Sequence, residues 1–345
     1  MMHDSLTAEL KAEALRLGFD LVGATAAGEP PGIERFRRWL ADGFAAGMHY
    51  IASRAEAYAH PRHVLEGVKS VLVLGTNYRS VEPVPPGPGQ GAVSRYCWGV
   101  DYHDVIFGRL GRLADFHRRL IPHGQVRGVV DTAPLLEREF AQLAGLGWIG
   151  KNTSLISSKF GSWIFLAALL TSEELQYDEP TTEGHCGSCT ACLDACPSGA
   201  LLEPYRVDAR KCISYLTVEL RELAGAELRE SIGERFFGCD ACQEACPFNR
   251  DTPSANEKNL DSFQPQPGSN PIDLAELFTM DDASMRERFR HTPLWRMKRQ
   301  GLLCNAAVVL GNHPHKAALP ALQQGLGDND PAVREACAWA LRRVR

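Results

Sequence analysis

The chain has 345 residues, of which 44% are hydrophobic and 23% charged, and its formal net charge is −5 at pH 7. This length allows two or three domains, and the composition is ordinary for a globular protein. No apolar run reaches the ~18 residues of a membrane span, and the acidic net charge argues against bulk electrostatic binding of nucleic acid but not against a local basic patch.

The N-terminal half predicts a mixture of helices and strands. A helix is expected at residues 5–18, because Ser5 can cap it and apolar residues recur on one face until Gly18. The first residues have neither the basic start nor the apolar core of a signal peptide, which predicts a cytoplasmic protein. The further expected elements are helices at 33–40 and 104–120, strands at 69–75, 126–130, 155–157 and 163–171, and a proline- and glycine-rich loop at 82–91.

Two single residues in this half have alternative interpretations. Asp131 follows the strand at 126–130, where a carboxylate could face the ligand crevice of an α/β sheet. It could equally cap the helix expected at 134–144. Cys97 lies in an aromatic segment, and from composition alone it could be a small buried hydrophobic residue.

The glycine-rich segment 145–154 partly matches two nucleotide-binding motifs. Its glycines fit G-x-G-x-x-G, but a helix precedes them and a strand follows, which is the reverse of the dinucleotide fingerprint. It also nearly fits the phosphate loop, except that Asn152 replaces the hydroxyl residue that binds magnesium. The segment therefore predicts either a simple turn or a loop whose backbone approaches a large planar ligand, with Lys151, Asn152 and Ser154 as donors.

Eight of the eleven cysteines lie between residues 186 and 246. They form one C-x2-C-x2-C-x3-C-P run, then a single cysteine, then a C-x2-C-x3-C-P run. Thiolates bind iron–sulfur clusters, and in two-cluster ferredoxins the last cysteine of each run serves the other cluster. The long gap between Cys212 and Cys239 predicts an inserted helix. The expected ligand sets are Cys186, Cys189, Cys192 and Cys246 for one [4Fe–4S] cluster, and Cys196, Cys212, Cys239 and Cys242 for the other.

Zinc and disulfide bonds are the alternatives for these cysteines. Zinc binds well to two C-x2-C pairs, but it requires neither the third closely spaced cysteine nor the proline after the fourth. Disulfides need an oxidising compartment, whereas the N-terminus predicts the reducing cytosol. Two iron–sulfur clusters are therefore the favoured interpretation.

The C-terminal part predicts helices and one basic patch. Helices are expected at 270–278 and 284–289, followed by three helical segments between 295 and 345 that are similar to a HEAT-type repeat. Cys304 and Cys337 lie on apolar faces of these segments and are expected in the core. The basic patch is a solvated face or a phosphate-binding surface, and its candidate residues are Arg286, Arg288, Arg296, Lys298 and Arg299.

Four features in this order resemble the epoxyqueuosine reductase family. They are the segment Asp131-Thr-Ala-Pro-Leu-Leu-Glu137, the segment Gly147-Trp-Ile-Gly-Lys-Asn-Thr153, the double cysteine run with Lys211-Cys212-Ile-Ser-Tyr, and the HEAT-like tail. The resemblance covers nearly the whole chain. It implies reduction of epoxyqueuosine to queuosine at the wobble position of tRNA, using cobalamin and two [4Fe–4S] clusters.

The resemblance also implies an α+β fold with three functional parts. These are a cobalamin-binding α/β domain at 1–175, similar to reductive dehalogenases and nitroreductases, a two-cluster ferredoxin-like domain at 176–255, and a HEAT-like repeat at 295–345 that contacts tRNA. A helical linker is expected at 256–294. No stretch predicts a dimer seam, so a monomer is expected.

Site residues follow from the same resemblance. Asp131 matches the proposed proton donor, which requires an apolar site that raises its pKa enough to keep it protonated at neutral pH. No D-x-H-x-x-G corrinoid motif occurs, so cobalamin rests on the resemblance alone. The residues expected near cobalamin are Arg54, Cys97, Asp131, Lys151, Asn152, Ser154 and Ser214.

Two other functions compete with the tRNA-modifying reductase. A corrinoid reductive dehalogenase of a small molecule usually carries an export signal and does not need a HEAT-like tail. A non-catalytic ferredoxin-type carrier leaves about 175 N-terminal residues without a role. The reductase is therefore the preferred function, with tRNA and an external electron donor as partners and no membrane.

Overall fold

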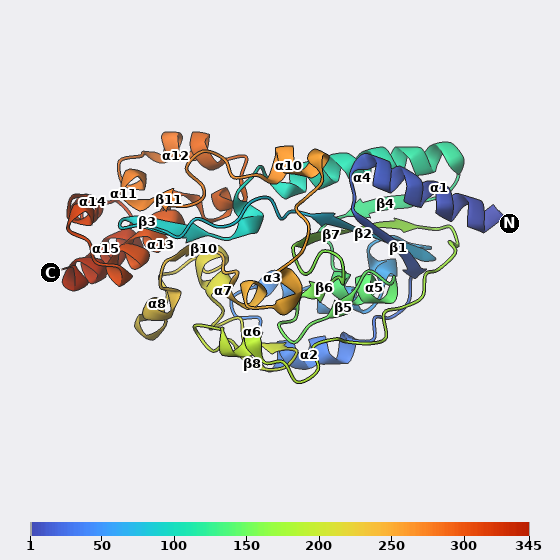
Figure 1. Ribbon diagram of the computed structural model, residues 1–345, viewed down its shortest axis with the longest axis horizontal. Coiled ribbons are helices and arrows are strands. Elements are labelled where there is room, and N and C mark those ends of the chain that lie inside the picture. The colour runs from blue at the N-terminus through green and yellow to red at the C-terminus, as the bar shows by residue number, and fades with distance from the viewer. Residues whose placement is uncertain (1, 345) are drawn as a thin grey trace.

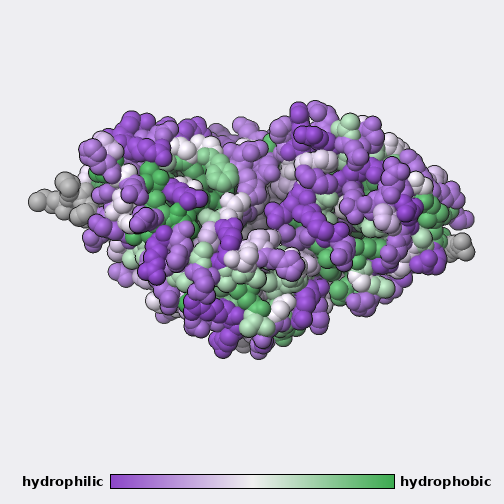
Figure 2. Space-filling view, turned by 180° about the vertical axis from the view of Figure 1, so that it is seen from behind, coloured by the Kyte–Doolittle hydropathy of each residue, from purple (hydrophilic) through white to green (hydrophobic). Residues whose placement is uncertain are grey.

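The computed structural model describes residues 2–344, whose two ends lie at opposite ends of an elongated molecule (Figure 1). The N-terminal sheet and its helices form one end, and the C-terminal helices form the other. Within residues 2–344, every helix is too short or too polar to cross a membrane. Figure 2 shows a largely hydrophilic face with smaller apolar patches.

A four-stranded sheet forms the centre of the N-terminal part. Its strands are β1 (Leu21–Ala26), β2 (Ser70–Asn77), β7 (Ile164–Thr171) and β4 (Val126–Val129), in the order β1-β2-β7-β4, and every neighbouring pair is antiparallel. The sequence predicted three of them but missed β1. The antiparallel pairing also means that the crevice rule for parallel α/β sheets does not explain the position of Asp131.

Helices cover both faces of this sheet because its central strands are apolar on both sides. Leu72 and Leu74 pack beneath α1 (Met2–Leu17) and α4 (Tyr102–Leu120), whereas Val71 and Val73 pack against α5 (Glu137–Leu143). This alternation is the two-residue period of a strand. Gly23 permits the end of α5 to approach β1, since a Cβ there would meet the Ala144 carbonyl oxygen at 2.0 Å.

The structure corrects two predicted helix starts. Helix α1 begins at Met2, so Ser5 lies inside it, where its hydroxyl donates to Glu9 Oε1 at 2.9 Å and caps nothing. Helix α5 begins at Glu137 instead of residue 134, and no side chain caps it. The alternative role of Asp131 as a helix cap is therefore wrong.

A second sheet joins segments that are far apart in the sequence. It has the order β10-β3-β11, from Arg235–Phe237, Gln90–Val93 and Ile272–Asp273. Strand β3 thus lies within the predicted N-terminal domain but pairs only with strands from beyond residue 175. The helix predicted at 270–278 is instead β11 followed by the short α11 (Leu274–Leu277).

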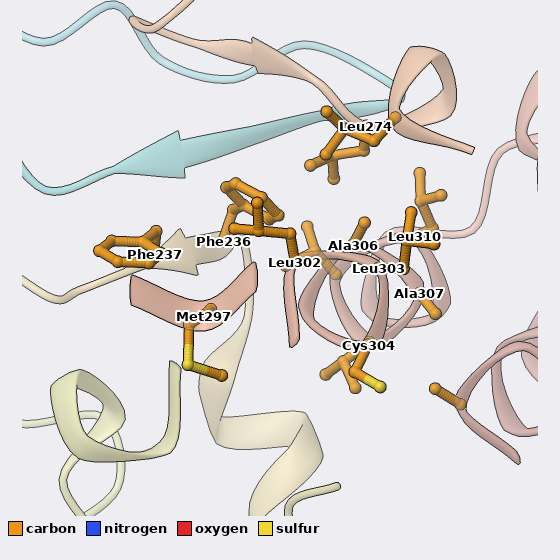
Figure 3. Close-up of a cluster of buried hydrophobic side chains, with 14 of the residues drawn as sticks. Phe236, Phe237, Leu274, Met297, Leu302, Leu303, Cys304, Ala306, Ala307 and Leu310 are labelled. Atoms are coloured by element: carbon orange, nitrogen blue, oxygen red, sulfur yellow. The ribbon is translucent and has the colours of Figure 1, made fainter. Parts of the chain in front are cut away.

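The C-terminal repeat contains the three predicted helices, α13 (Lys298–Asn312), α14 (Leu319–Gly325) and α15 (Pro331–Arg343). Helix α13 is buried along most of its length. Figure 3 shows its Leu302, Leu303 and Ala306 beside side chains of β10 and α11. Cys304 and Cys337 are 7% and 0% exposed, which confirms that they lie in the core.

The cysteine-rich part contains only short elements. The predicted insertion between Cys212 and Cys239 consists of two helices, α7 (Ile213–Val218) and α8 (Ala226–Ile232), followed by β10. The other elements of the chain are α2 (Ile33–Ala41), α3 (His49–Ala52), β5 (Trp148–Ile149), β6 (Leu155–Ile156), α6 (Ala191–Asp194), β8 (Leu201–Glu203), β9 (Arg206–Val207), α9 (Ala241–Glu244), α10 (Glu257–Phe263) and α12 (Asp282–Phe289).

Candidate active site

A cavity of about 620 Å³ lies where the N-terminal sheet, the cysteine-rich part and the C-terminal helices meet. Its volume falls within the range of ligand-binding sites. One part of the lining comes from the loop after β4 and the start of α4, and another comes from the end of α7 and the segment that leads into α13. The charged and aromatic residues of the lining are Tyr50, Arg54, Tyr58, Tyr96, Asp101, Tyr102, His103, Asp131, Glu219, Arg290, Trp295, Arg296 and Lys298.

Asp131 is the centre of a hydrogen-bonded acid network in this cavity. His103 Nε2 lies 2.8 Å from one of its carboxylate oxygens, and the Tyr102 hydroxyl donates to the other. On the far side of the imidazole ring, His103 Nδ1 lies 2.7 Å from Asp101 Oδ1. The network therefore joins two carboxylates through one imidazole.

The electrostatics place the proton on the histidine. Burial alone would lower the pKa of His103, but the hydrogen bonds that its ring donates to Asp101 and Asp131 outweigh burial and raise the pKa to about 9. Burial acts to raise the pKa of Asp131, yet the hydrogen bonds from His103 and Tyr102 bring it below its usual value. The expectation that an apolar site keeps Asp131 protonated is therefore wrong, because two donors stabilise its carboxylate.

The backbone also presents Asp131 to the cavity in an unusual conformation. Its φ angle is +24°, in the left-handed region that few non-glycine residues adopt. The next carbonyl group, that of Thr132, accepts a hydrogen bond from Arg54 Nη2 at 3.0 Å. Arg54 thus lines the cavity and also holds the loop that carries Asp131.

Cationic side chains line one wall of the cavity, at the segment that leads into α13. Arg296 forms an ion pair of 2.6 Å with Glu219, and the Lys298 ammonium lies 4.7 Å from the centre of the Trp295 ring. Two other residues of the predicted basic patch have acidic partners of their own, Glu276 for Arg288 and the buried Asp328 for Arg299. Arg286 is exposed on α12.

The cysteines of the first predicted ligand set lie close enough together to raise the pKa values of one another's thiols. Burial raises the pKa of the Cys192 thiol, and the nearby thiols of Cys186 and Cys246 raise it further. Burial likewise raises the pKa of Cys246, to which Cys186 and Cys189 add. Cys189 is exposed, so this group lies at the surface.

The second four form a separate group, and each of them is partly exposed. Burial raises the pKa of Cys242, and the thiols of Cys239, Cys212 and Cys196 add to the effect. Within residues 2–344 no three His, Cys, Asp or Glu side chains are arranged to hold a single ion. Thiolates of a four-iron cluster each bind a different iron, so they lie further apart than the ligands of one ion. The donor sets therefore fit two clusters.

The glycine-rich segment lies against the cysteine runs and does not line the cavity. Lys151 Nζ donates to the carbonyl oxygens of Gly187 and Cys189 at 2.7 and 2.9 Å. Asn152 Nδ2 lies 3.4 Å from the Cys242 carbonyl oxygen and so reaches the second group. The segment forms a hairpin of β5 and β6, in which a side chain at Gly147 would meet the Ile156 carbonyl oxygen at 2.2 Å.

Three other residues predicted near cobalamin also lie outside the cavity lining. Ser154 donates its N–H to Asn152 Oδ1 at 3.2 Å, which closes the turn. The Ser214 N–H donates to the sulfur of Cys212, which lowers the pKa of that thiol against the effect of burial. Cys97 is 1% exposed beneath Tyr96, whose hydroxyl it contacts by a hydrogen bond. Their contact with cobalamin stays a prediction.

Sequence reasoning missed Asp101, Tyr102 and His103. The available signal was Asp101 at the start of a predicted helix, where its side chain accepts the N–H of His103 at 3.0 Å. A capped helix start fixes the side chains of its first turn. Nothing local, however, indicated that this turn faces Asp131, which is 28 residues further along the chain.

Three family models match parts of the chain. A "4Fe-4S double cluster binding domain" matches residues 185–249, "Epoxyqueuosine reductase QueG, DUF1730" matches residues 59–132, and "HEAT repeats" matches residues 300–345. The first model contains all eight cysteines of the two groups. The second ends just beyond Asp131.

Curated relatives match nearly the whole chain. The epoxyqueuosine reductase of Pseudomonas aeruginosa is 39% identical over 98% of this chain and 94% of its own length. That of Escherichia coli is 36% identical over 98% of this chain and 89% of its own length.

Solved structures also match nearly the whole chain. A crystal structure of epoxyqueuosine reductase with an epoxyqueuosine-modified tRNA-Tyr stem loop has a TM-score of 0.91 at 30% identity, covering 99% of this chain and 90% of that one. The Bacillus subtilis enzyme, with its catalytic aspartate loop swung out of the active site, has a TM-score of 0.89 at 29% identity, with the same coverage.

Proposed function

Since this chain belongs to the epoxyqueuosine reductase family, we propose that it reduces the epoxide of epoxyqueuosine in tRNA to the alkene of queuosine. In this reaction both C–O bonds of the epoxide break, a C=C bond forms, and the oxygen leaves as water. Two electrons and two protons are consumed. The protein must therefore deliver electrons and protons to the same place.

The observation that carries the proposal is the acid network in the cavity. His103 is protonated at neutral pH because its pKa is about 9. Its Nε2 lies 2.8 Å from Asp131 Oδ1, so Asp131 takes up the proton of Nε2 and passes it to the departing oxygen. Asp101 stabilises the imidazolium from the other side, and Tyr102 fixes the second oxygen of Asp131.

This chain offers sites for both cofactor types of the family. When bound, two [4Fe–4S] clusters supply electrons one at a time and cobalamin supplies a cobalt centre that delivers two to the substrate. The two cysteine groups would hold the clusters. Cobalamin would bind at the cavity, which Arg54 and Tyr58 line together with Asp131.

The second cysteine group, which contains Cys212, is the one closer to the cavity in this proposal. Cys212 precedes α7, and the far end of that helix, Val218 and Glu219, lines the cavity. The other group includes the exposed Cys189, which suits the entry of electrons from an external donor. Electrons would then enter at the first group, which contains Cys189, and would reach the cavity through the second group, which contains Cys212.

The cationic wall is the proposed tRNA contact. Arg296 and Lys298 line the cavity itself, so they are placed to neutralise phosphates beside the wobble nucleotide. Arg286 is exposed and extends this contact along α12, whereas Arg288 and Arg299 do not line the cavity. We further propose that the protein acts in the cytoplasm, because its proposed substrate is tRNA. We also propose that it acts as a monomer.

The test uses anaerobically reconstituted protein with cobalamin, a chemical reductant and an anticodon stem-loop that carries epoxyqueuosine. Mass spectrometry should show loss of one oxygen that depends on both cobalamin and Asp131. If cobalamin binds but the RNA stays unchanged, the substrate assignment is wrong. If cobalamin does not bind, the assignment of the cavity is wrong as well.

A further inference from the structure

Glu137 is a buried carboxyl group that the reaction described above does not use. It is the first residue of α5, six residues after Asp131. Its Oε1 is buried without a hydrogen-bond partner among residues 2–344. Such an atom is costly to bury, so its position calls for a physical reason.

The contact that Glu137 does make is with the backbone of Asp131. The Asp131 N–H is a hydrogen-bond donor close enough to this carboxyl group to lower its pKa. The Asp131 backbone is left-handed at φ +24°, a conformation that its surroundings must hold in place. Arg54 holds the following carbonyl group, so the loop is fixed on both sides of the Asp131–Thr132 peptide.

We propose that Glu137 is a positioning residue for Asp131: by accepting the Asp131 N–H, it holds the backbone conformation from which the Asp131 carboxylate reaches both His103 and Tyr102. Without this acceptor the loop can relax to an ordinary conformation. The carboxylate then turns away from its two donors, and proton delivery to the cavity fails. This inference rests on the proposed function and assigns a further residue to the same site.

The charge state of Glu137 decides which substitution preserves its role. Burial raises its pKa to about 8, and the negative charge of Asp131 raises it further, whereas Arg138, the Asp131 N–H and His103 act in the opposite direction. Below that pH the group is a neutral acid with one accepting oxygen. A glutamine has the same shape, no charge and the same accepting oxygen.

Glu139 provides a matched control in the same helical turn. It is also acidic and lies two residues along α5, but its carboxylate pairs with Arg35 at 2.6 Å. Both residues interact alike with the positive end of the helix. A loss of activity seen on substitution of Glu137 but not of Glu139 is therefore not explained by the loss of a negative charge at the start of α5.

The experiment compares E137L, E137Q and E139L with the wild type in the reconstituted stem-loop assay. We expect kcat to fall about 100-fold in E137L with KM for the RNA within about threefold, because a small displacement of a catalytic group has an effect of that size. E137Q should stay within about fivefold of wild type, and E139L should match wild type. Unchanged kcat in E137L, or equal losses in E137L and E139L, overturns the proposal.

A second measurement does not depend on turnover. Hydrogen–deuterium exchange of the cofactor-free protein should show peptides covering residues 126–136 exchanging faster in E137L than in the wild type, E137Q and E139L. If E137L does not fold, E137A is used with the same readouts. Equal exchange in all variants overturns the positioning role. A wild-type protein that is inactive on the RNA refutes the proposed function instead, while the exchange data still decide the role of Glu137.

Discussion

Replacing Asp131 by asparagine tests the acid network most directly, because the side chain keeps its shape and loses its charge. The D131N variant leaves His103 with one carboxylate partner, Asp101, instead of two. We expect two linked effects. Turnover should fall by about 10²- to 10⁴-fold, the usual contribution of a positioned proton donor, and the pKa of His103 should decrease.

The structure sets the size of the second effect. At about 1.4 kcal/mol per pKa unit, a rise from 6.5 to about 9 corresponds to about 3 kcal/mol of stabilisation by protonated His103, whose side chain is 23% exposed. Because the pKa is higher in the folded protein, this stabilisation is complete below pH 6.5 and is lost as the pH rises through 9. Two carboxylates share it, so D131N should forfeit about half, or about 1.5 kcal/mol at pH 6.

The assay is a pH titration of ¹⁵N-labelled imidazole signals by NMR, with H103Q to assign the resonance. In the wild type, His103 should titrate near pH 9, and in D131N it should titrate roughly one pKa unit lower. Urea unfolding should show a larger destabilisation by D131N at pH 6 than at pH 10. A wild-type His103 that titrates near 6.5 refutes the assignment of the proton to the imidazole, and a D131N enzyme with near-normal turnover refutes the role of Asp131.

Two further predictions concern the RNA contact and the clusters. The double variant R296Q/K298Q should bind the stem-loop more weakly, and the dependence of its affinity on salt concentration should fall by about one unit of slope for each lost phosphate contact. The control R118Q, which changes an exposed residue of α4, should leave this slope unchanged. An unaltered slope in the double variant contradicts the proposed contact. C246S should retain about four iron atoms per chain in place of about eight. The control C304S, in the core of the C-terminal repeat, should retain the full iron content. Equal iron content in both variants contradicts the ligand assignment.

Local sequence patterns were sufficient for the features that depend on local spacing. The cysteine runs and the helices of the C-terminal repeat follow from residues that are close in the sequence, and the structure contains these helices where they were predicted. Strand β1 was missed because Gly23, Ala24 and Ala26 have weak strand propensity. Its pairing with the fully buried β2 forms it nonetheless.

The acid network was beyond prediction for a different reason. Asp131 was singled out by its place after a strand, but its protonation depends on partners that only the fold brings to it. His103 and Tyr102 come from the first turn of α4, and their hydrogen bonds reverse the pKa change that burial alone would cause. A pattern within one segment carries no information about such a pairing.

The C-terminal repeat has a second role, which follows from how it holds α7. That helix has six residues and is therefore about 9 Å long, so it links Cys212 at its start rigidly to the cavity wall at its end. Asn305 of α13 donates to the Thr217 carbonyl oxygen at 2.9 Å, and the Thr217 hydroxyl accepts the Gly238 N–H at 2.9 Å, next to Cys239. Removing the repeat should therefore disturb two proposed cluster ligands as well as the proposed RNA surface, so only charge substitutions on the intact chain can isolate its contribution to RNA binding.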